Sequence, residues 1–151
     1  MKGMWKATVS LVAAICLGVT ALLTAGQQSE GAENGVQLLI PIMRPERGRQ
    51  LFASKGCVVC HSINGVGGRG AAALDASTMK GLMNPFDFAA KMWRGAPVMI
   101  AMQIGELGHQ IEFTGQELAD IIAFVHDSDE QRKFSTKDIP PNIRKLMRRK
   151  D

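Results

Sequence analysis

The sequence has little cysteine, and this limits the kinds of site it can build. There are three cysteines in 151 residues, and only Cys57 and Cys60 stand close together. A structural zinc site usually takes four ligands from two such pairs, and the chain has no second pair. Outside the N-terminal apolar tract, the other candidate zinc ligands are His109 and His126. The composition therefore argues against structural zinc.

The sequence also lacks strand patterns and a strong basic excess. No stretch alternates apolar and polar residues long enough to predict a β-strand, and there is no internal repeat. A thioredoxin-like dithiol needs a βαβ context, so its absence argues against that reading of the cysteine pair. The 18 Lys and Arg against 14 Asp and Glu give a net charge of +4, which is not typical of a nucleic-acid-binding protein. These absences favour a small all-α protein.

Two segments carry clear helical signals. In "ERGRQLFASKG", Gly48 and Phe52 are four residues apart and share a face, and Gly56 predicts the end of the helix. In "TGQELADIIAFVHD", Thr114 and Glu117 predict a capping box ahead of an apolar face. We expect these two helices to form the frame of the domain.

The middle of the chain predicts loops and one short helix. "HSINGVGGRGAAALD" is rich in glycine and predicts a loop. "NPFDFAAKMWRGAP" predicts a helix capped by Asn84, with Pro85 in its first turn and its end at Gly95 and Pro97. The methionine-rich stretch that follows would then be a loop. A domain of roughly 100 residues with so few helices is short of core, so something else must fill its centre.

The N-terminus has the layout of an exported protein. Lys2 and Lys6 precede an apolar tract at residues 7–25. As a helix this tract would be about 28 Å long, which nearly spans a bilayer. We expect residues 1–26 to be a cleaved signal peptide or an uncleaved anchor rather than a buried core helix, and residues 27–44 to be a linker. The rest of the chain would then lie in the bacterial periplasm, attached to the inner membrane if the anchor is retained.

The motif "CVVCH" favours a covalently bound haem. C-x-x-C-H is the attachment signature of haem c. The thiols of Cys57 and Cys60 can bond to the vinyl-derived carbons on one edge of the porphyrin, and His61 can then bind the iron as its proximal ligand. Haem c is attached outside the bacterial cytoplasm, and it would supply the missing core. The redox dithiol and the zinc half-site are the weaker alternatives.

From Gly48 to Asp127 the chain resembles the class I c-type cytochromes, which are small monohaem electron carriers. "GRQLFASKGCVVCH" is similar to the family's first helix and haem site, and "ELADIIAFV" to its last helix. Phe124 and Ile121 stand at that helix's usual aromatic and apolar positions. The resemblance implies an all-α cytochrome c fold around one covalently bound haem in residues 45–127, with the first and last helices crossing closely at Gly48.

The resemblance also implies a methionine as the sixth iron ligand. The family places it in the loop before the last helix, where Met99 is the first candidate and Met102 the alternative. If neither methionine binds the iron, its sixth position is either filled by His109 or left open. The family usually carries a proline where Ala72 stands, and we expect the Ala72 carbonyl to hold the second ring nitrogen of His61.

The implied function is single-electron transfer between redox enzymes of the bacterial envelope. The partners would be a redox donor and a redox acceptor, with no nucleic acid, and the protein would not be an enzyme. The alternatives are a dedicated subunit of an oxidoreductase, or an open-site haem sensor or peroxidase. Residues 128–151 form a basic C-terminal extension. Its basic end, "NIRKLMRRKD", is either a solvated tail or a docking patch for an acidic partner or anionic lipid. Trp93 and Arg94 are candidates for contact with the haem edge or its propionates.

Overall fold

The computed structural model describes residues 37–79, 81 and 83–148. The predicted signal peptide or anchor, residues 1–26, lies outside these residues. Among the described helices, none is long and apolar enough to cross a membrane. The chain divides into Met1–Leu39 and a compact unit, Ile40–Asp151, whose fold follows.

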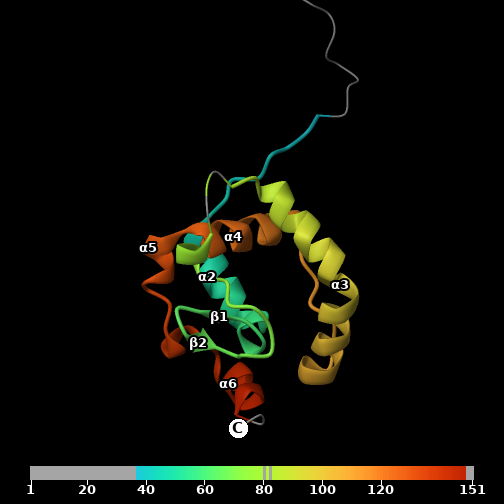
Figure 1. The fold of residues 1–151 in the computed structure, drawn as a ribbon, viewed down its shortest axis with the longest axis vertical. Coiled ribbons are helices and arrows are strands. Elements are labelled where there is room, and N and C mark those ends of the chain that lie inside the picture. The colour runs from blue at the N-terminus through green and yellow to red at the C-terminus, as the bar shows by residue number, and fades with distance from the viewer. Residues whose placement is uncertain (1–36, 80, 82, 149–151) are drawn as a thin grey trace, which may run out of the picture. The chain divides into compact units, whose positions relative to one another are not determined.

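The compact unit is mostly helical, as predicted. Figure 1 shows its helices around one short hairpin. The two strands of this hairpin are antiparallel, with Ser62 opposite Gly67 and Ile63 opposite Val66. Strands of two residues are too short to give an alternating pattern, so the sequence could not predict them. In chain order the elements are α2 (Pro45–Ser54), η1 (Cys57–Val59), β1 (Ser62–Ile63), β2 (Val66–Gly67), η2 (Ala76–Thr78), α3 (Pro85–Leu107), α4 (Gly115–His126), α5 (Ser128–Gln131), η3 (Thr136–Asp138) and α6 (Pro141–Met147).

Helices α2 and α4 cross at Gly48, which confirms the predicted close crossing. A Cβ atom at Gly48 would lie 2.6 Å from the carbonyl carbon of Asp120 and 2.7 Å from Cβ of Phe124. Only glycine permits this approach. The Asp120 side chain is fully buried beside the crossing, where it accepts hydrogen bonds from the Arg44 backbone N–H (2.9 Å) and from Arg47 (2.8 Å). These bonds tie the start of α2 to the middle of α4.

The predicted caps of α4 and the predicted end of α2 are also confirmed. The hydroxyl of Thr114 accepts from the backbone N–H of Glu117 (3.2 Å), and the Glu117 carboxylate accepts from the backbone N–H of Thr114 (2.9 Å). Helix α2 ends just before Gly56, whose φ of 90° favours glycine. Both helices therefore follow from local sequence signals.

The C-terminal extension adds residues to the core, and the prediction of a solvated tail is wrong at Ile143, which is buried. The rings of Phe52, Phe124 and Phe134 lie 5.6 to 5.7 Å apart in pairs, in tilted or edge-on arrangements that stabilise aromatic contacts. Phe134 is buried, and so are Ile139 and Ile143 farther along the segment. A small domain is short of apolar core, and this segment adds to it.

Helix α3 is longer than predicted. Its start is confirmed, because the Asn84 side chain accepts from the backbone N–H of Phe86 (3.0 Å). The predicted end at Gly95 and Pro97 is wrong, because α3 continues through both residues for a total of 23. A proline inside a helix removes one hydrogen bond and clashes with the carbonyl four residues before it, which is why Pro97 predicted a stop. The helix ends instead at Gly108, a left-handed cap with a φ of 82°.

Candidate haem-binding site

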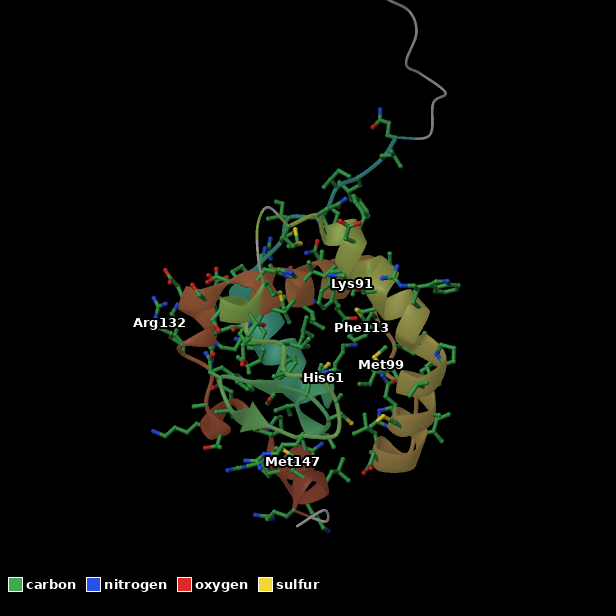
Figure 2. All side chains as sticks on the ribbon, viewed as in Figure 1. His61, Lys91, Met99, Phe113, Arg132 and Met147 are labelled. Atoms are coloured by element: carbon green, nitrogen blue, oxygen red, sulfur yellow. The ribbon has the colours of Figure 1, made fainter. Side chains whose placement is uncertain are left out.

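An apolar cavity of about 570 Å³ lies between α3 and the segment that follows α2. Its volume falls within the range of ~300–1,000 Å³ that holds small molecules and cofactors in proteins. The walls come from residues 56–61, the loop at 70–74, one face of α3, and the residues leading into α4. Figure 2 shows Met99 reaching from α3 toward the part of the cavity where His61 lies. The predicted haem ligands therefore share one cavity.

The C-x-x-C segment divides its side chains between this cavity and the core. Residues 57–59 form a 3-10 turn, in which side chains three positions apart are on the same side. Cys57 and Cys60 accordingly both line the cavity. Val58 and Val59 are buried in the core instead. The turn thus presents two thiols together and anchors itself through the two residues between them.

The surroundings of the two thiols argue against a redox dithiol and against a zinc site. Burial, reinforced by the nearness of Cys60, raises the pKa of Cys57 to about 12, so this thiol is protonated at neutral pH. A redox-active dithiol needs a lowered pKa, because the thiolate is its reactive form. Within the described residues, no group of three or more His, Cys, Asp or Glu side chains could hold a metal ion. Neither a redox dithiol nor a zinc site fits this geometry.

The ring of His61 is held in the orientation that an iron ligand needs. Its Nδ1 lies 2.7 Å from the carbonyl oxygen of Ala72, which confirms the predicted hydrogen bond. Since a carbonyl only accepts, Nδ1 carries the proton and Nε2 is left to bind metal. The Ala71 N–H donates to the Cys60 carbonyl (3.0 Å), which ties the loop to the motif. This bond fixes the loop where the family usually has a proline.

The two candidate sixth ligands lie on α3. Met99 and Met102 both line the cavity and are half-buried. They project from a helix, so the prediction that they lie in a loop is wrong. They are three positions apart, which puts both on the same helix face. The choice of Met99 as the ligand, with Met102 as the alternative, stays a prediction.

Three other candidate residues, Trp93, Arg94 and His109, are not found in the cavity wall. Trp93 is 82% exposed, and neither it nor Arg94 lines the cavity. Because α3 continues past Gly95, the residues at 93 and 94 are directed away from the cavity face. His109 is exposed beyond the end of α3, with its Nδ1 near the Leu107 carbonyl (3.2 Å).

Two polar residues of the wall were missed by the sequence reasoning. Lys91 and Gln103 line the cavity together with Gly95 and Met99, and the four residues are spaced at intervals of four along α3. Gln103 is nearly buried, and its Oε1 accepts from the backbone N–H of Ile111 (2.8 Å). Lys91 places an ammonium group near the cavity, where the carboxylates of a haem would be attracted to it. A helix predicted to continue through Pro97 would have revealed both.

The family model of cytochrome c matches residues 45–129, which is more than half of the chain. The chain belongs to the cytochrome c family. Comparisons with curated proteins and with solved structures gave no significant match. The cofactor is therefore haem c, bound covalently through Cys57 and Cys60, and the general function is electron transfer by a haem protein.

The residues of the cavity fit this cofactor. Two thiols face the cavity from one turn, an imidazole is fixed with Nε2 free, and two thioethers lie on α3. When bound, the haem supplies an iron that gains and loses one electron. The chain tethers the haem through Cys57 and Cys60, orients His61 through the Ala72 carbonyl, and limits the access of water with apolar walls.

Proposed function

We propose that this cytochrome c is a single-electron carrier between redox proteins of a bacterial envelope and is not itself an enzyme. The observation that carries the proposal is that His61 and a methionine of α3, Met99, line the same apolar cavity from different segments. An iron bound by both has no open position for a substrate. An electron carrier only has to change the charge of its iron by one, so an iron whose six coordination positions are all filled suits this role.

The chemistry of these two ligands supports a carrier. A neutral thioether such as Met99 stabilises ferrous iron and raises the reduction potential relative to a second imidazole. The hydrogen bond from His61 to Ala72 fixes the tautomer and raises the basicity of the other ring nitrogen. The hydrogen bond therefore holds the His61 ring in the orientation in which it would bind the iron.

The location and partners follow from the N-terminus and from the haem. The charged and apolar layout of residues 1–26 supports export to the periplasm. If this tract is retained, it attaches the domain to the inner membrane. The part of the predicted linker that precedes Ile40, where the compact unit begins, would then let the domain reach its partners. The electron donor and acceptor are redox proteins of this compartment.

A dedicated subunit of an oxidoreductase is the second candidate, favoured by the outer surface of α3. Phe86, Trp93 and Ile104 are 71%, 82% and 56% exposed. They are seven and eleven residues apart, so they lie along one face of the helix, and exposed apolar faces are typical of protein interfaces. Replacing Trp93 with Ser should release the protein from a permanent complex in a co-purification experiment, and should leave a free carrier unaffected.

The test of the carrier is the visible absorption spectrum of the haem-loaded protein. The ferric form should show the weak red band of methionine–iron ligation, and the ferrous form should not respond to carbon monoxide. Met99→Ala should lose the band and gain carbon monoxide binding, and Met102→Ala should change neither. Rapid carbon monoxide binding by the unmodified protein would contradict the proposal and favour an open-site sensor or peroxidase.

A further inference from the structure

The net positive charge of the chain is concentrated at its C-terminal end. Residues 144–151 contain five Lys and Arg and one Asp, so they account for the whole net charge of +4. Residues 1–143 have no net charge. The described cations of this segment are Arg144, Lys145 and Arg148, and all three are exposed. The molecule is therefore electrically polarised toward α6.

Helix α6 is packed against the turn that tethers the haem. Ile143 is buried, and its Cδ1 lies 3.8 Å from the place of a Cβ on Gly56, directly before the first haem-binding cysteine. Met147 packs against the core cluster that contains Val58. The helix contacts η1, which begins with Cys57. Figure 1 shows α6 at the end of the fold opposite the start of α3, and Figure 2 labels Met147 there.

The cations of α6 are not neutralised within the described part of the chain. None of Arg144, Lys145 and Arg148 forms a salt bridge among the described residues, although other basic residues do. Those paired with carboxylates are Arg47, Arg49, Lys55, Arg132 and Lys133. Arg144 and Arg148 are four residues apart and share a face of the helix. Their charges are therefore directed at solvent.

We propose that Arg144, Lys145 and Arg148, the α6 basic surface, dock an acidic surface of the redox partner beside the haem-tethering turn. The inference rests on the proposed carrier function, because it requires that electrons pass at this end of the molecule. Electron-transfer complexes are small and transient, and complementary charge mainly raises their rate of association. The α6 basic surface lies beyond residues 45–129, so it is not part of the matched family domain.

Small oxidants of opposite charge test the proposal on the haem-loaded full chain. In stopped flow, ferrous protein gives one electron to hexacyanoferrate(III), producing ferric protein and hexacyanoferrate(II). The double variant Arg144→Gln, Arg148→Gln should slow this reaction about threefold or more at low ionic strength, and the difference should disappear at high salt. With tris(phenanthroline)cobalt(III), a cation, the same variant should react faster than the unmodified protein.

A second double variant, Arg94→Gln with Arg132→Gln, removes two positive charges from α3 and from the end of α5 and serves as the control. It should keep a rate with hexacyanoferrate(III) close to that of the unmodified protein. Equal slowing of both variants would show that only net charge matters, and would overturn the proposal. Loss of binding to vesicles of anionic lipid, with unchanged oxidation rates, would also overturn it, because the surface would then bind lipid. Ferrous protein that neither oxidant oxidises would instead refute the carrier function.

Discussion

Replacing Gly48 with alanine should strongly destabilise the domain. The added Cβ would lie 2.6 Å from the Asp120 carbonyl carbon and 2.7 Å from Phe124 Cβ, and closer still to the Asp120 carbonyl oxygen. Carbon atoms in ordinary contact are about 3.5–4.0 Å apart, so α2 and α4 must separate by about 1 Å. The neighbouring atoms are backbone and Cβ, so they cannot move by a simple change of rotamer.

The size of the effect follows from three terms. Overpacking of a close core contact costs about 1–3 kcal/mol. Separation of the helices also stretches the bonds to the buried Asp120 carboxylate from Arg44 and Arg47, and breaking a buried pair costs about 3–5 kcal/mol. Alanine regains about 1 kcal/mol of helix propensity. We expect a net loss of about 3 kcal/mol in the free energy of unfolding, since the bonds stretch rather than break.

Guanidinium unfolding of the ferric haem-loaded protein, followed by far-UV circular dichroism, measures this loss. The midpoint should fall by about 1 M. Gly105→Ala is the matched control, because Gly105 also lies inside a helix, but an added Cβ would have no atom within 4 Å apart from its chain neighbours and the backbone of its own helix. The control should gain about 0.4–1 kcal/mol. An unchanged midpoint for Gly48→Ala would refute the close crossing of α2 and α4.

Two further predictions concern buried polar groups. Gln103→Leu leaves the Ile111 N–H without its acceptor and should lower the free energy of unfolding by about 1–3 kcal/mol, whereas Gln103→Glu, which keeps the acceptor, should lose less. Burial alone would raise the pKa of Glu130, but hydrogen bonds and charges from Lys133 and Arg49 outweigh it and hold the pKa below its usual range. This stabilisation is complete above the unfolded pKa of about 4.3 and is lost as the pH falls through the folded pKa. Urea midpoints measured from about pH 6 to 3 should therefore fall less steeply for Glu130→Gln than for the unmodified protein. Equal falls in the two proteins would contradict a stabilising role of the Glu130 carboxylate.

The parts of the fold that could be predicted are those with local signals. The capping box of Thr114 and Glu117 begins α4 by itself, and the spacing of Gly48 and Phe52 identifies the crossing face of α2. The haem-tethering motif is equally local, because the two thiols and the imidazole of His61 come from five consecutive residues. Such features need no knowledge of distant contacts.

The parts that could not be predicted depend on contacts between distant segments. Phe134 stands alone in a polar stretch, and only its contact with the rings of Phe52 and Phe124 shows that it is a core residue. Pro97 is an ordinary helix stop by propensity, yet α3 continues through it and keeps its cavity face continuous. Because the sequence predicted that the helix ends near Pro97, it did not predict that Lys91 and Gln103 line the cavity. They share a face with Met99 only if the helix is unbroken.

A potentiometric titration of the haem-loaded protein tests the central claim most directly. The account predicts a single reversible one-electron transition, and a lower midpoint potential for Met99→Ala, because loss of the thioether destabilises ferrous iron. Met102→Ala should keep the midpoint of the unmodified protein. A titration without a reversible one-electron transition, or an unchanged midpoint in Met99→Ala, would contradict an electron carrier whose iron is held between His61 and Met99.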